Sequence, residues 1–128
     1  MIILDASVGV SIALGQERAI SQVKGFGVLL APYLIDAEVL QSLRGLVLGR
    51  KVTEQQGVEA VGNWQKILIS RRSVHDLSSR VWELRHNVTA YDASYVVLAE
   101  AYQCPLLTAD RRLAAADGPR CAIMVVGR

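Results

Sequence analysis

Four acidic residues stand where a protein of alternating strands and helices could use them for chemistry: Asp5, Glu38, Asp92 and Asp110. Asp5 directly follows three apolar residues, and Asp110 follows another short apolar segment, so each is expected near the end of a buried strand. Glu38 and Asp92 fall near the starts of two predicted helices. Because ligands of open parallel sheets bind at the carboxyl ends of the strands, we expect the four carboxylates to meet at that edge.

A shared edge would bring negative charges together, and this limits the chemistry. Carboxylates that lie close together raise one another's pKa, so the cluster is costly unless a cation compensates it. Ligand sets made only of oxygen favour Mg²⁺ or Mn²⁺. Such an ion can lower the pKa of a water molecule and stabilise the leaving oxygen of a phosphodiester. The pattern therefore predicts metal-assisted hydrolysis of a phosphodiester bond.

Each acid, taken alone, also has an ordinary structural explanation. Asp5 and Asp110 could cap the helices that follow them. Asp92 stands three residues after Thr89, which is the spacing of a capping box, and the helix dipole favours an acid in the first turn. Glu38 could lie on a solvent-exposed helix face. Only the joint arrangement of the four acids favours a functional site.

The elements that must position these acids follow from hydrophobic periodicity and from helix start and stop signals. Strands are predicted at 2–4, 28–31, 105–108 and 122–126. Helices are predicted at 6–14, 17–24, 33–48, 53–69, 73–86, 90–103 and 110–116. This alternation indicates an α/β fold with a mostly parallel sheet and helices on both faces. The basic pairs at 50–51 and 71–72 are expected in solvent-exposed loops, and Trp64 and Trp82 in the core or at a dimer interface.

Length and composition predict a single domain, 1–128, that needs no disulfide to form its core. Hydrophobic residues make up 52% of the chain, yet no apolar run approaches the roughly 18 residues of a membrane span. No basic segment precedes the first apolar residues, so a secretory signal is not indicated and a cytoplasmic location is expected. Cys104 and Cys121 are expected to be reduced, and His75 and His86 lack a third ligand at zinc spacing.

The net charge of +2 conceals an uneven distribution. With the four candidate acids set aside in a pocket, eight of the 12 acidic residues remain against 14 Lys and Arg. A basic body around an acidic site suits a polyanion handled through metal ions. Arg111 and Arg112, next to Asp110, could hold substrate phosphates through bidentate contacts or could simply be exposed.

Four segments together resemble a known family. They are Asp5 with Ser7, the run 32–44 (PYLIDAEVLQSLR), the run 89–95 (TAYDASY) and the run 107–113 (LTADRRL). In this order and at these intervals they resemble a PIN-domain ribonuclease, and length and order are similar to those of VapC-type toxins of bacterial toxin–antitoxin pairs. The resemblance covers the chain from end to end.

The resemblance implies a Mg²⁺- or Mn²⁺-dependent endoribonuclease with a three-layer α/β/α sandwich. By motif position, the catalytic and metal-binding residues would be Asp5, Glu38, Asp92 and Asp110. Ser7 and Thr108 would support them as polar neighbours, although ordinary post-strand and cap hydroxyls explain both equally well. Ser7 stands where relatives often have Asn, which leaves open its role in holding water. Such toxins typically form homodimers and are neutralised by a cognate antitoxin, whose C-terminal segment covers an apolar groove and can place a basic side chain in the acidic pocket.

Other functions remain open from the sequence. The carboxylates alone do not distinguish RNA from DNA, because this hydrolysis needs no 2′-hydroxyl. A phosphatase of the haloacid-dehalogenase type also has an Asp after its first strand, but it predicts a second Asp where this chain has Ser7. A non-catalytic nucleic-acid-binding or regulatory domain predicts the loss of an acid, and all four are present.

Overall fold

The centre of the fold is a five-stranded parallel sheet, seen in a computed structural model that describes residues 1–126. Its order is β3-β2-β1-β4-β5. The strands are β1 (Ile2–Leu4), β2 (Leu29–Pro32), β3 (Ser70–Arg72), β4 (Leu106–Thr108) and β5 (Ile123–Val125). Each neighbouring pair is parallel, so all five strands end at the same edge.

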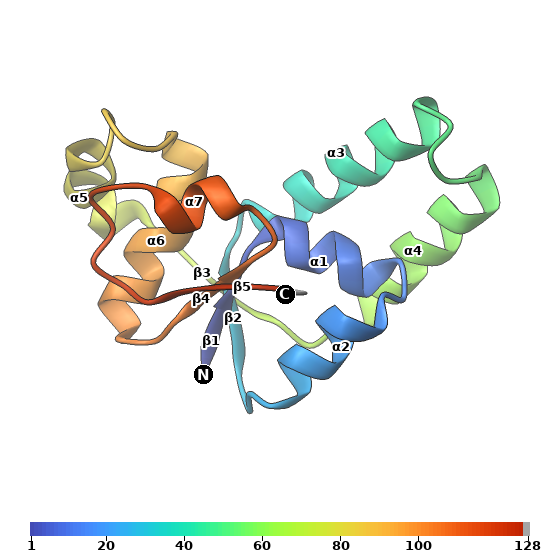
Figure 1. Ribbon diagram of the computed structural model, residues 1–128, viewed down its shortest axis with the longest axis horizontal. Helices are drawn as coiled ribbons and strands as arrows, with labels where there is room; N and C mark the ends of the chain where they lie inside the picture. The colour runs from blue at the N-terminus through green and yellow to red at the C-terminus, as the bar shows by residue number, and fades with distance from the viewer. Residues whose placement is uncertain (127–128) are drawn as a thin grey trace.

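Two layers of helices enclose the sheet (Figure 1). One layer contains α1 (Ala6–Ala13), α2 (Glu17–Lys24), α3 (Ile35–Leu48) and α4 (Glu54–Lys66). The other contains α5 (Ser78–Glu83), which follows the short helix η1 (His75–Leu77), with α6 (Ala90–Tyr102) and α7 (Arg111–Ala115). This arrangement confirms the predicted α/β/α fold with its parallel sheet.

The central strands form the most deeply buried part of the sheet. Every residue of β1 and β4 is fully buried, because helices cover both faces. Helix α6 packs against β1, β2 and β4 and buries the run 93–99. Local signals set two helix starts as predicted: Thr53 and Gln56 form a reciprocal capping box before α4, and Thr89 caps α6. The two strands that end beside the candidate acids thus lie in the core.

The expectation that residues 71–72 form a solvent-exposed loop is wrong. Ser70–Arg72 is the edge strand β3, which pairs with β2, and α4 consequently ends at Lys66 instead of near residue 69. Arg71 donates from Nε and Nη2 to the two carboxylate oxygens of Asp36, each at 2.7 Å. Edge strands often carry basic side chains, which disfavour pairing with a strand of another chain. For this reason β3 lacks the apolar pattern by which a strand is predicted from sequence.

The two tryptophans have different environments. Trp64 is only 4% exposed and packs so closely on α1 that a Cβ added to Gly9 would lie 2.8 Å from its ring. Its indole Nε1 donates to Asp36 Oδ1 at 2.9 Å. Trp82 is 67% exposed and stacks on the Arg85 guanidinium, so a place in the core is wrong for it.

Two further expectations concern membrane spans and the state of the cysteines. Among residues 1–126, no helix has the length and hydropathy needed to cross a membrane. Cys104 and Cys121 are half-buried and free, as expected for reduced thiols.

Candidate active site

A cavity of about 460 Å³ opens at the carboxyl edge of the sheet. Three of the four predicted acids line it: Asp5 after β1, Glu38 in the first turn of α3, and Asp110 after β4. Ser7 and the exposed Tyr91 line it too. Segments more than 100 residues apart in the sequence therefore meet here, because parallel strands deliver their carboxyl ends to one edge.

Asp5 is held in place by two hydroxyl groups. It is 7% exposed, and its Oδ2 accepts hydrogen bonds from Ser7 Oγ at 3.0 Å and from Thr108 Oγ1 at 2.5 Å. Although Asp5 occupies the N-cap position of α1, its side chain makes no cap hydrogen bond, so the capping explanation is wrong for this residue. The other carboxylate oxygen, Oδ1, accepts no hydrogen bond from residues 1–126, and Asp5 itself lines the cavity.

The same hydroxyls connect the start of α1 to the loop that follows β4. Ser7 Oγ accepts from the Ala109 backbone N–H at 3.0 Å, and Thr108 Oγ1 accepts from the Asp110 N–H at 3.0 Å. Thr108 is fully buried, so its hydroxyl has no access to bulk solvent. Ser7 and Thr108 therefore lie behind Asp5 as a hydrogen-bonded support.

Glu38 contacts a residue that the sequence reasoning did not single out. Tyr95 is 1% exposed, and its hydroxyl donates to Glu38 Oε1 at 2.6 Å. Burial raises the pKa of Glu38, the hydrogen bond from Tyr95 opposes this rise, and the charges of Asp5 and Asp92 add to it. Glu38 is therefore not a solvent-face residue. The available signal was the spacing, since Tyr95 follows Asp92 by three positions and lies on the same side of α6.

Asp92 lies in the same electrostatic field, although it does not line the cavity. Burial raises the pKa of its carboxyl group first, and the charges of Asp5 and Asp110 raise it further. The charge of Arg112 lowers it. The backbone N–H of Asp92 donates to Thr89 Oγ1 at 3.1 Å, so the predicted cap of α6 coexists with this interaction.

Asp110 and its basic neighbours lie at the rim. Asp110 Oδ1 accepts from the Arg112 backbone N–H at 2.9 Å, so the capping explanation is correct for this acid. Asp110 also lines the cavity, so the same residue both caps α7 and contributes to the site. The Arg112 Nε lies 3.7 Å from Asp110 Oδ1, and its side chain is 95% exposed. Arg111 is exposed as well, so both guanidinium groups can reach a ligand in solution.

The donors of this cavity suit a hard divalent cation. Its lining offers carboxylate and hydroxyl oxygens, and no His or Cys is among the lining residues. Within residues 1–126, no three His, Cys, Asp or Glu side chains already form a closed ligand cluster. Mg²⁺ is usually bound by one or two carboxylates and keeps several water ligands, so these residues fit a partly hydrated ion better than a fully enclosed one.

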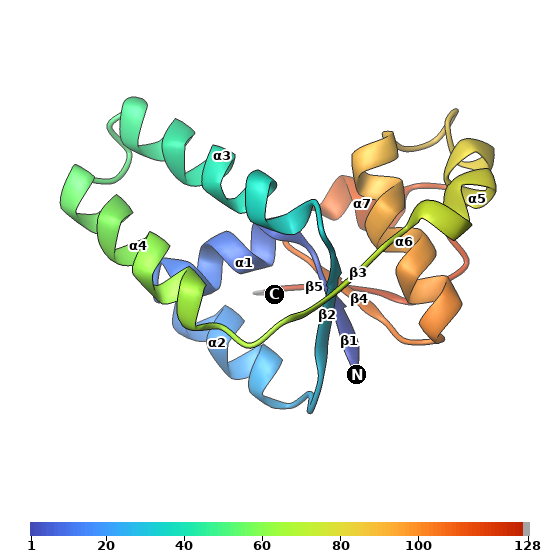
Figure 2. The same cartoon turned by 180° about the vertical axis from the view of Figure 1, so that it is seen from behind.

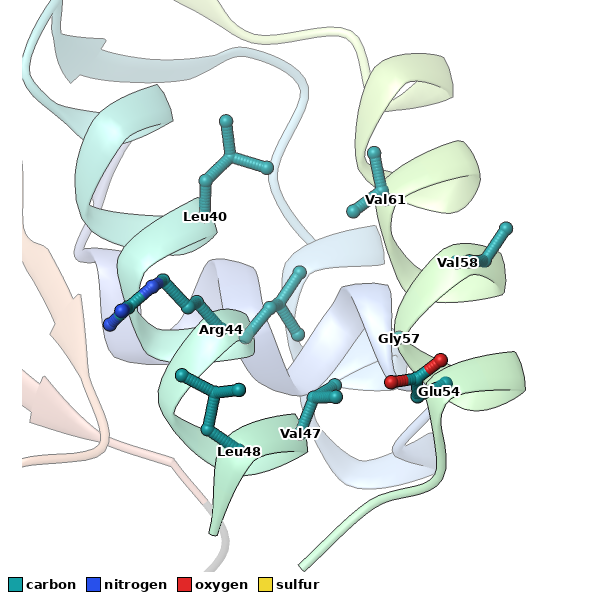
Figure 3. A pocket seen from close by; sticks show the side chains of 9 residues that line it. Leu40, Arg44, Val47, Leu48, Glu54, Gly57, Val58 and Val61 are labelled. Carbon is teal, nitrogen blue, oxygen red and sulfur yellow. The ribbon is translucent and has the colours of Figure 1, made fainter. Parts of the chain in front are cut away.

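A second, apolar groove lies between α3 and α4 (Figure 3). Its volume is about 330 Å³, and its lining includes Leu40, Val47, Leu48, Val58 and Val61. Val58 is 73% exposed and Leu48 65% exposed, so the groove presents apolar surface to solvent. One helix, α3, thus contributes to both the acidic cavity and the groove.

Comparisons with known proteins agree with this architecture. A family model described as PIN domain matches residues 2–119. The chain is 39% identical over 128 residues to Ribonuclease VapC9 of Mycobacterium tuberculosis, covering all of both chains. It is 49% identical over 98 residues to Ribonuclease VapC1 of the same species, covering 75% of this chain and 73% of that one. The crystal structure of PAE2754 from Pyrobaculum aerophilum shares the fold, with a TM-score of 0.66 and 23% identity over 95% of this chain and 87% of that one. The resemblance seen in the sequence motifs is therefore confirmed, and the chain belongs to the PIN-domain family.

Proposed function

We propose that this protein is a Mg²⁺- or Mn²⁺-dependent endoribonuclease, the toxin of a type II toxin–antitoxin system, acting in the cytoplasm. The observation that carries the proposal is the meeting of Asp5, Glu38 and Asp110 in one cavity, with Asp92 in the same field. The choice of RNA over DNA rests on relatives that are named VapC ribonucleases. Membership of the PIN-domain family leaves the haloacid-dehalogenase alternative without support.

The chain's own residues prepare the site for phosphodiester hydrolysis. A divalent cation, when bound, supplies positive charge against the phosphodiester and acidifies a water molecule. Asp5 is fixed by two hydroxyl donors, which leaves its other oxygen free to bind. Without compensation, these carboxylates would repel a phosphate, so the same acids that hold a cation also make cleavage depend on it. The exposed guanidinium groups of Arg111 and Arg112 would hold flanking phosphates.

The proposed protein partner is a cognate antitoxin. The groove between α3 and α4 supports it, because its exposed aliphatic side chains suit a segment that buries apolar residues (Figure 3). Arg44 and Glu54 also line the groove and offer one charge of each sign to such a segment. A homodimer is proposed as well, from the family resemblance.

The direct test is cleavage of total RNA in Mg²⁺ or Mn²⁺, with EDTA and a DNA substrate as comparisons. We expect Asp5→Asn to abolish cleavage, because it removes a carboxylate from the cavity. Asp76→Asn makes the same chemical change at an exposed acid outside the cavity and should leave cleavage intact. If Asp5→Asn cleaves as the wild type does, the active-site assignment is wrong. RNA binding without cleavage under all conditions would favour the non-catalytic alternative.

A further inference from the structure

The hydrogen bond between Tyr95 and Glu38 joins two layers that the sheet otherwise separates. Helix α3 packs on α1 and α4, whereas α6 packs on α5 and on β1, β2 and β4. Figure 2 shows α3 and α6 on opposite sides of the strands. Tyr95 nevertheless reaches across the carboxyl edge, and its hydroxyl lies 2.6 Å from Glu38 Oε1.

The surroundings of Tyr95 leave its hydroxyl a single described acceptor. The side chain is 1% exposed, so water does not compete for the hydroxyl, and Glu38 is the acceptor found within residues 1–126. Only Oε1 of Glu38 takes part, while Oε2 accepts no hydrogen bond from the described residues. Because Glu38 lines the cavity, its second oxygen is available there.

We propose that Tyr95 is a positioning residue for metal binding, an inference that rests on the proposed function. Its hydroxyl fixes the carboxylate of Glu38 against the α6 layer, so that Oε2 is presented to a divalent cation. A Glu side chain has several rotatable bonds, and ordering it before the ion arrives removes part of the entropic cost of binding. Hydrogen bonds from groups behind a metal ligand orient that ligand in this way in many metal sites.

The test compares the Mn²⁺ affinity of Tyr95→Phe with that of the wild type. Affinity is read from the rise in melting temperature as Mn²⁺ is added, which requires no RNA and no turnover. We expect Tyr95→Phe to need about tenfold more Mn²⁺ for the same rise. Tyr102→Phe is the matched control, because it removes a hydroxyl from the same helix that contacts Arg72 and lies outside the cavity. Melting in EDTA and the near-ultraviolet circular dichroism spectrum check that each variant folds.

A double-mutant cycle separates positioning from general packing. In a Glu38→Gln background, Tyr95→Phe should cause no further loss of Mn²⁺ affinity, because the carboxylate that Tyr95 orients is gone. Equal losses in both backgrounds, or wild-type affinity in Tyr95→Phe, would overturn the inference and leave the proposed function standing. A wild-type protein that binds Mn²⁺ no better than Asp5→Asn would overturn both.

Discussion

The hydroxyl of Thr108 offers a sharp test of how the site is built. Thr108→Val keeps the volume and the β-branching of the side chain but removes its oxygen. Three hydrogen bonds disappear: one to the Asp5 carboxylate, one from the Asp110 backbone N–H, and a long one of 3.5 Å with Ser7 Oγ that contributes little. A hydrogen bond to a charged group contributes about 1.5–3 kcal/mol and a neutral one about 1 kcal/mol. Water can replace the second partner because Asp110 is only half-buried, so we expect the free energy of unfolding to fall by about 2–3 kcal/mol.

The measurement is urea denaturation in EDTA at pH 7, which keeps metal binding out of the comparison. The midpoint should move to lower urea while the slope stays the same, since the surface exposed on unfolding hardly changes. Ser7→Ala is the comparison: it removes the other donor to Asp5 and the acceptor of the Ala109 N–H, but from a half-buried position where water can replace part of both, so it should cost less than Thr108→Val, about 1–2 kcal/mol. A loss below about 0.5 kcal/mol for Thr108→Val would refute the reasoning, because the Asp5 carboxylate would then not depend on this donor.

Three other outcomes are expected. The pKa values of Glu38 and Asp92 are raised, so the folded protein binds protons at these two carboxyl groups more tightly than the unfolded chain does. The stability that this proton binding contributes is therefore complete below their ordinary pKa values of 4.5 and 3.8. It is lost as the pH rises through the pKa values of the folded protein. Urea denaturation of metal-free protein should therefore show Asp92→Asn gaining stability over the wild type as the pH rises towards 7, and a gap that does not change with pH would contradict this. Gly9→Ala should lower the free energy of unfolding by about 1–3 kcal/mol, because the new methyl group meets the Trp64 ring; an unchanged melting temperature would show that the ring can move aside. Val58→Glu should weaken antitoxin binding in a pull-down while RNA cleavage persists, and undiminished binding would place the antitoxin elsewhere.

Elements with a strong local signature could be predicted from the sequence. The strand Ile2–Leu4 is a short apolar run, and Thr53 and Thr89 are typical caps of the helices that follow them. The strand and both helix starts therefore lie close to their predicted positions. Strand β3 could not be found in this way. Its residues are polar and basic, and only its pairing with β2 and the ion pair between Arg71 and Asp36 make it a strand.

For the candidate site too, some features could be predicted from the sequence and others depend on contacts that only the folded chain makes. That Asp5 and Asp110 would meet follows from the parallel sheet, since each lies within two residues of the end of one of two neighbouring strands. Which acid also caps its helix depends on side-chain rotamers, which is why capping is absent at Asp5 and present at Asp110. Tyr95 was missed because it is a buried aromatic residue on an apolar helix face, and packing alone explained its presence.

The length of α3 sets the distance between the acidic cavity and the apolar groove, because the helix contributes residues to both. Glu38 in its first turn faces the acidic cavity, and Leu48 at its end belongs to the apolar groove. Ten helical residues at a rise of 1.5 Å each separate them by about 15 Å along the helix axis. An extended peptide covers that span in about five residues. An inhibitor seated in the groove at Leu48 therefore needs only a short tail, of roughly that length, to bring a cationic group to the carboxylates.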